Sequence, residues 1–204
     1  MTHDNFKTDL TACDADEKRR AFMQKHIMHG LPFVFAGRED EYFEFRTRIA
    51  QHFGINYQNV FIVGSAKLGF NYFSGKAFSY ESDIDVVLVD ERLFERYYEN
   101  ICDYQYQLDK NYRAIDSREL NLYRSFLQYL VKGWMRPDKL PLSFEISILK
   151  DEWFGFFQSI SFGKSEVGNY KINAGLFKNT AYLEKYYLNG VTEFYNQLKI
   201  PSNG

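Results

Sequence analysis

Two stretches, VFIVGSAKLGF at residues 60–70 and SDIDVVLVD at residues 82–90, decide how this chain folds. Each contains a short apolar run rich in β-branched residues, which predicts a buried strand. The first run ends at Gly64, where the chain turns, and the second follows Asp83 directly. Residues 65–82 between them are rich in Gly, Ser, Asn and Lys, which predicts a loop. The two stretches therefore predict two strands joined by a long polar connection.

Helical periodicity surrounds these strands. Apolar residues recur every three or four positions over 39–53, 94–108 and 123–134, and again over 180–198. We therefore expect a helix in each of these ranges.

Local signals mark where helices begin and end. Gly54 stands where a helix over 39–53 needs its carboxyl-terminal cap. Asp116 and Glu119 have the spacing of a capping box for a further helix. The polar residues 1–20 are compatible with a flexible arm or with the first turns of a helix. The stretch LSFEISIL at 142–149 alternates apolar and polar residues, which predicts a half-exposed strand.

The predicted elements give the fold class. Strands packed against helices indicate an α+β protein with a mixed sheet. We expect one domain over residues 1–204, with a helical insertion at about 91–135 and a carboxyl-terminal helix at about 180–198.

Composition limits the function. Apolar residues make up 45% of the chain, with 20 Phe and 16 Tyr, which is enough to build a core. The net charge of −2 argues against a module that binds duplex DNA. The chain has no apolar run of the roughly 18–20 residues that cross a bilayer, and no secretory signal. Cys13 and Cys102 form no disulfide framework, so we expect a cytoplasmic protein without membrane contact.

Paired carboxylates carry the chemistry. Side chains alternate along a strand, so Asp83 and Asp85 project from one face while Ile84 and Val86 project from the other. Two neighbouring carboxylates repel each other when both are ionised. A divalent cation removes this conflict, and hard cations such as Mg²⁺ prefer oxygen ligands. The pair therefore predicts a site for Mg²⁺ or Mn²⁺ with Asp83 and Asp85 as ligands.

The turn before this strand suits a phosphate group. Gly64 has no Cβ, so the backbone N–H groups around it and the Ser65 hydroxyl can approach a phosphate closely. Lys67 offers a positive charge nearby. Gly64, Ser65 and Lys67 are thus candidate nucleotide-binding residues.

The same residues resemble the signature of the DNA polymerase β-like nucleotidyltransferase superfamily. That signature is an apolar strand, Gly-Ser, a loop, and Asp-x-Asp on the next strand, here Gly64-Ser65 and Asp83-Ile84-Asp85. The resemblance implies an α+β core with a mixed sheet, two Mg²⁺ ions, and transfer of a nucleoside monophosphate from an NTP to a hydroxyl acceptor. It also implies a third carboxylate on a later strand. The loop between Ser65 and Asp83 is longer than in minimal members of the superfamily.

Glu145 is the candidate third carboxylate. In LSFEISIL it shares the polar face with two serines, where it is placed as a third metal ligand would be. Members of the superfamily more often use Asp there. The predicted catalytic and metal-binding set is thus Asp83, Asp85 and Glu145.

The acceptor stays open at this stage. The resemblance allows a nucleotide or oligonucleotide, as in bacterial relatives of cyclic GMP-AMP synthase in phage-defence signalling, a protein hydroxyl, as in antitoxin-type transferases, or a small molecule. ATP is the expected nucleotide, and a partner protein or a second copy of the chain is compatible with the pattern. The alternative is a catalytically inactive nucleotide-binding protein, which would lack the third carboxylate.

Overall fold

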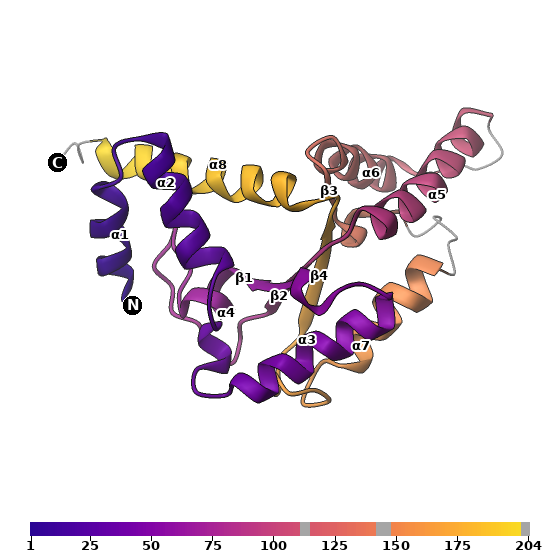
Figure 1. The fold of residues 1–204 in the computed structure, drawn as a ribbon. Coiled ribbons are helices and arrows are strands. Elements are labelled where there is room, and N and C mark those ends of the chain that lie inside the picture. The colour runs from indigo at the N-terminus through magenta and orange to yellow at the C-terminus, as the bar shows by residue number, and fades with distance from the viewer. Residues whose placement is uncertain (111–114, 142–147, 201–204) are drawn as a thin grey trace.

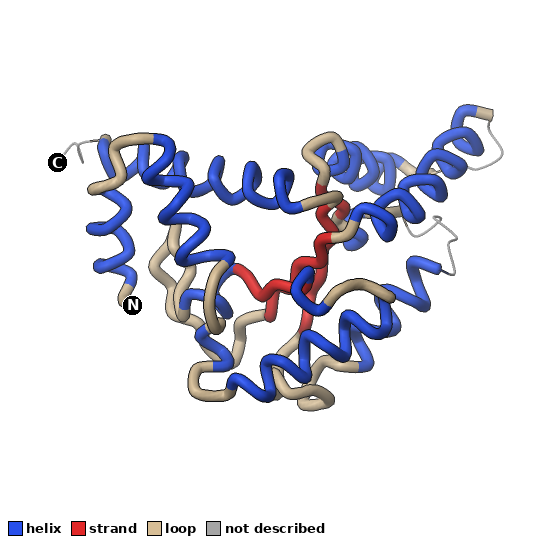
Figure 2. The backbone as a smooth tube through the Cα atoms, in the orientation of Figure 1, coloured by secondary structure: helices blue, strands red, loops and turns tan. Residues whose placement is uncertain are grey.

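A computed structural model of the chain describes residues 1–110, 115–141 and 148–200 (Figures 1 and 2). These residues form an α+β protein in which helices cover both faces of one sheet. The eight α-helices of the described residues are α1 (His3–Thr11), α2 (Asp16–Met23), α3 (Glu39–Phe53), α4 (Gly64–Leu68), α5 (Glu91–Asp109), α6 (Ser117–Leu130), α7 (Phe156–Ser159) and α8 (Thr180–Lys199).

The described residues also contain four strands and five short helical segments. The strands are β1 (Val60–Val63), β2 (Ile84–Val89), β3 (Trp134–Met135) and β4 (Ile172–Phe177). The π-helical segments are η1 (Gln24–Met28) and η5 (Ile148–Gly155), and the 3₁₀ segments are η2 (Phe33–Phe35), η3 (Tyr57–Asn59) and η4 (Pro137–Lys139).

The sheet has the order β1-β2-β4-β3 and is mixed. β2 pairs antiparallel with β1 and parallel with β4, while β3 pairs antiparallel with β4. The register sets Val63 opposite Asp85 on one side of β2, and Asn173 opposite Asp85 on the other. Asp85 therefore lies between the end of β1 and the beginning of β4.

The core is divided between the two faces of the sheet. Ile84, Val86 and Leu88 pack in a cluster with side chains from α3, α5 and α6. Val87 and Val89, on the opposite face, pack in a second cluster with side chains from α1, α2 and α8. Figure 1 shows the sheet between α8 on one side and α3 with α7 on the other. Because both faces are covered, β2 is open to solvent only at its amino-terminal end.

Most elements lie where the sequence predicts them. α3 ends at Gly54, which has a left-handed φ of 65°, and α6 begins with the Asp116–Glu119 capping box. The carboxyl-terminal helix, α8, spans Thr180–Lys199. The first 23 residues contain α1 and α2, which contact α8, and Phe6 and Phe22 belong to the same core cluster as side chains of α8.

Two predictions at element ends are wrong, and a third falls mostly outside the described residues. The connection after β1 begins with the five-residue helix α4 and is not all loop. Trp134 belongs to β3, because Gly133 turns the chain out of α6 with a φ of 70°. Of the strand predicted at 142–149, residues 142–147 lie outside the described residues, and the last two begin η5.

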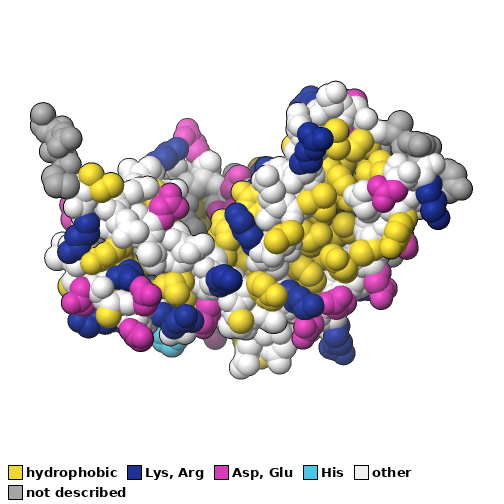
Figure 3. All heavy atoms as spheres, turned by 90° about the horizontal axis from the view of Figure 1, so that it is seen from above, with side chains coloured by type: hydrophobic (Ala, Val, Ile, Leu, Met, Phe, Trp, Pro, Cys, Tyr) yellow, Lys and Arg dark blue, Asp and Glu magenta, His cyan; other side chains and the backbone are white. Residues whose placement is uncertain are grey.

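Apolar side chains are exposed on the half of the molecule that holds α5 and α6 (Figure 3). Tyr98 and Tyr106 of α5 are 41% and 63% exposed, and Leu122 of α6 is 36% exposed. No helix within the described ranges is long and apolar enough to cross a membrane.

Candidate functional site

One edge of the sheet brings the predicted site residues together. β1 ends where β2 begins because the two strands are antiparallel, and β4 begins beside β2 because those two are parallel. Gly64, Asp83 and Asp85 therefore meet Lys171 and Asn173 at this edge.

Gly64 touches Asp85 directly. Its φ of 65° lies in the left-handed region that favours glycine. A Cβ on Gly64 would lie 2.9 Å from an Oδ atom of Asp85. The backbone conformation thus favours glycine at the end of β1, and a larger residue there would displace the Asp85 carboxylate.

Asp83 is held by two neighbours from the start of β4. The Asn173 side-chain amide donates a hydrogen bond of 2.8 Å to the Asp83 carboxylate, and the Lys171 ammonium lies 3.9 Å from the same oxygen. The Lys171–Asp83 pair is exposed, so its contribution to stability is small. Its effect is to bring a positive charge to the edge of the site.

Asp85, like Asp83, is an exposed residue, and it is the exposed position of β2. Protein atoms around the carboxyl group raise its pKa by desolvation, and the negative charge of Asp83 raises it further. The guanidinium of Arg136 opposes this increase. The two aspartates thus form an electrostatically strained pair, which binding of a cation would relieve.

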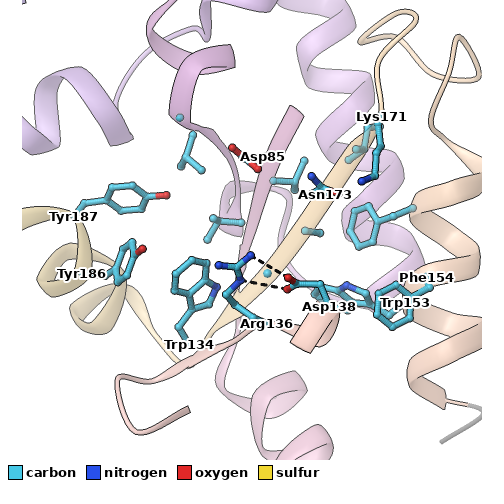
Figure 4. A pocket seen from close by; sticks show the side chains of 18 of the residues that line it. Asp85, Trp134, Arg136, Asp138, Trp153, Phe154, Lys171, Asn173, Tyr186 and Tyr187 are labelled. Atoms are coloured by element: carbon cyan, nitrogen blue, oxygen red, sulfur yellow. Dashed lines mark hydrogen bonds and ion pairs between the residues drawn. The ribbon is translucent and has the colours of Figure 1, made fainter. Parts of the chain in front are cut away.

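Asp85 lines a cavity of about 540 Å³ (Figure 4). Aromatic side chains form much of its wall: Trp134 from β3, Trp153 and Phe154 from η5, and Tyr186 and Tyr187 from α8. Burial raises the pKa of the Tyr187 hydroxyl well above its ordinary value, so this hydroxyl stays protonated and can donate a hydrogen bond.

Arg136 is the main cation inside the cavity. Its guanidinium donates two hydrogen bonds to Asp138, at 3.2 and 3.0 Å, and lies over the rings of Tyr129 and Trp134 at 5.2 and 5.3 Å from their centroids. A guanidinium fixed in this way is suited to bind a phosphate oxygen.

Three predicted residues stand apart from this arrangement. Ser65 is half-buried in α4 and does not line the cavity. The Lys67 ammonium is buried and donates to the carbonyl oxygens of His29 and Gly30, at 2.5 and 2.6 Å. Desolvation lowers its pKa to about 8. Lys67 thus binds the segment after η1, away from the cavity. Glu145 lies outside the described residues.

The sequence reasoning missed β4 and Arg136. Asn173 interrupts an apolar stretch, and Gly175 weakens the strand signal in the same stretch. Gly175 is required there because a Cβ would meet the indole of Trp134. Arg136 gave no signal, since only the fold brings it near Asp85.

The described residues contain no group of three His, Cys, Asp or Glu side chains arranged to hold a metal ion. Comparison of the chain with protein-family models, with curated proteins and with solved structures found no match in any of the three.

Proposed function

We propose that this chain is a metal-dependent nucleotidyltransferase with a polymerase β-like core, which transfers a nucleoside monophosphate from an NTP to a hydroxyl acceptor. The observation that carries the proposal is the close approach of Gly64 to Asp85, which lines a cavity and follows Asp83 by two positions. ATP is the nucleotide we expect.

The residues fit one divalent ion better than two. Mg²⁺ in phosphate-transfer sites is commonly held by one or two carboxylates together with substrate phosphates and water. Asp83, directly before β2, and Asp85, within β2, supply two carboxylates at positions i and i+2. Asn173 stands on the neighbouring strand, where the resemblance implies a further carboxylate. When bound, the ion would neutralise charge on the triphosphate and on the leaving pyrophosphate.

The chain's own groups would bind and orient the nucleotide. Arg136 and Lys171 supply positive charge on either side of Asp85, and the fixed guanidinium of Arg136 suits a phosphate oxygen. The glycine at position 64 lets backbone approach the phosphates. Trp134 and Tyr186 offer aromatic faces on which a base could stack.

Asn173 favours a second candidate, a nucleotide-binding protein without transferase activity. Asn173 places an uncharged amide, which donates a hydrogen bond to Asp83, on the strand where the resemblance implies a metal-ligating carboxylate. Such a protein would bind the metal–nucleotide complex and respond to it without turnover.

Incubation with each α-³²P-labelled NTP and Mg²⁺ or Mn²⁺ tests both candidates. We expect wild type to move label into a product, and Asp83→Asn/Asp85→Asn to be inactive because both carboxylate ligands are lost. Asp103→Asn, which changes an exposed carboxylate of α5, is the matched control and should keep wild-type activity.

The outcomes separate the candidates. Label transfer that requires Asp83 and Asp85 supports the transferase. Nucleotide binding that requires them, with no transfer under any condition, supports the second candidate. Transfer that persists in the double variant at the wild-type rate contradicts the proposed site.

A further inference from the structure

A second, open cavity of about 830 Å³ runs along α8 and adjoins the first. Tyr72 and Tyr186 line both cavities, so the two adjoin at these rings. We call the second cavity the α8 groove. Its lining residues are Tyr72, Phe73, Tyr129, Val131, Lys132, Tyr182, Lys185, Tyr186, Asn189, Gly190, Thr192, Glu193, Asn196, Gln197 and Ile200.

Aromatic rings form the walls of the α8 groove, and glycines set their positions. Gly190 lies so close to the Tyr72 hydroxyl that a Cβ would approach it to 2.7 Å. Gly133, with a φ of 70°, lets the ring of Tyr182 lie against the backbone. Phe73 packs beside Tyr72, with ring centroids 4.5 Å apart.

Two of these rings keep large exposed surfaces. Phe73 is 43% exposed and Tyr182 is 37% exposed. Exposed aromatic faces in a groove are the platforms on which unpaired bases stack, whatever their sequence.

The charges of the α8 groove favour an anion. Two exposed lysines, Lys132 and Lys185, line the groove, and Glu193 is the one acidic residue among its lining residues. The Lys132 ammonium lies 5.4 Å from the centroid of the Tyr129 ring, so cation and aromatic surface are next to each other. Lysines beside aromatic rings suit a strand that alternates phosphates and bases.

We propose that the α8 groove binds a single-stranded oligonucleotide, the acceptor of the transferred nucleotide. This inference rests on the proposed function and deepens it. The strand would lie along α8 and pass Tyr72 and Tyr186, so that its terminal hydroxyl enters the first cavity beside Asp85. The hydroxyl oxygen forms a bond to the α-phosphorus of the NTP, the bond from that phosphorus to the β-phosphate oxygen breaks, pyrophosphate leaves, and the hydroxyl proton passes to solvent.

An extended peptide is the competing occupant, and the groove chemistry argues against it. Peptide strands bind mainly by adding to an exposed sheet edge through backbone hydrogen bonds. The α8 groove is lined by residues of α6 and α8, by Ile200 directly after α8, and by the loop segments 72–73 and 131–132, and no strand residue lies among its lining residues. A peptide is therefore a control ligand in the test.

Fluorescence anisotropy with a labelled twelve-nucleotide single-stranded RNA and its DNA equivalent tests the inference. We expect Lys132→Ala/Lys185→Ala to weaken binding and to reduce the slope of log K against log salt by about 1.4, since each phosphate contact to a single strand contributes about 0.7. Tyr182→Ala should weaken binding by about tenfold through the loss of one stacking contact. Lys25→Ala/Lys164→Ala, which changes two exposed lysines outside both cavities, should bind as wild type.

Binding by Asp83→Asn/Asp85→Asn separates this inference from the proposed function. The α8 groove lies beside those carboxylates and does not include them, so we expect the double variant to bind the oligonucleotide normally. If neither wild type nor any variant binds an NTP, while oligonucleotide binding still depends on Lys132 and Lys185, the result supports the α8 groove as an oligonucleotide site and contradicts the proposed function. If no single strand binds, if the groove variants bind as tightly as wild type, or if a peptide binds better than either strand, the inference is overturned.

Discussion

Substitution of Gly64 by alanine measures the energetic cost of placing a Cβ between the end of β1 and the Asp85 carboxylate. An alanine with a φ of 65° costs about 1–2 kcal/mol of stability, because its Cβ crowds the carbonyl oxygen. The same Cβ would lie 2.9 Å from the Asp85 carboxylate, which must rotate away. Displacing a side chain from its preferred rotamer costs a further 0.5–1.5 kcal/mol, roughly.

Gly54→Ala is the matched control for this substitution. Gly54 has the same φ of 65°, but a Cβ there meets nothing within 4 Å. Backbone strain should destabilise both variants, and only Gly64→Ala should lose a further 0.5–1.5 kcal/mol of stability, roughly. At roughly 2–4 °C per kcal/mol for a chain of this size, the difference between their melting temperatures is about 1–6 °C.

Binding of Mg²⁺–ATP provides the second measurement on the same pair. Displacement of Asp85 should weaken binding by on the order of tenfold in Gly64→Ala, since altered positioning of a metal ligand commonly costs that much. Gly54→Ala should bind as wild type. Equal binding by Gly64→Ala and wild type would refute the assignment of Gly64 and Asp85 to one site.

Three further substitutions test separate features. Lys67→Met removes an ammonium whose pKa is lowered from 10.5 to about 8 in the folded protein. Between these two values the unfolded chain holds the proton and the folded chain does not, so the stability of wild type rises with pH. In urea unfolding, the free energy of unfolding of wild type should increase by about 1.5 kcal/mol relative to the variant between pH 8 and 9.5. Asn173→Asp adds a carboxylate beside Asp83 and should increase the rise in melting temperature on adding Mg²⁺, whereas an equal rise in both proteins contradicts the proposed ligand arrangement. Asp116→Ala removes the capping box of α6 and should cost about 1 kcal/mol, measured by thermal unfolding.

Elements with local signals could be predicted from the sequence. The end of α3 at Gly54 and the start of α6 at Asp116 follow from side-chain and backbone chemistry within one turn. β1 and β2 were predictable because each is a short apolar run with polar or turn-forming residues at its ends. The meeting of Gly64 with Asp85 was predictable too, because two consecutive strands commonly pair.

Features that depend on distant contacts were not predictable. β4 contains Asn173 and Gly175, which are poor strand formers, and it exists as a strand because β2 and β3 pair with it on either side. Lys67 has the sequence position of a phosphate-binding residue, yet the carbonyl groups of the segment after η1 bind its ammonium. Its role as a nucleotide ligand stays a prediction without support from the geometry.

Calorimetric titration of the four NTPs, each with Mg²⁺ and with EDTA, is the most direct test for a metal–nucleotide site at Asp83 and Asp85. We expect wild type to bind at least one NTP only when Mg²⁺ is present, Asp83→Asn/Asp85→Asn to bind none, and Asp103→Asn to bind as wild type. Binding that is indifferent to Mg²⁺ and to both aspartates, or no binding of any NTP by wild type, would contradict a metal–nucleotide site at the junction of β1 and β2.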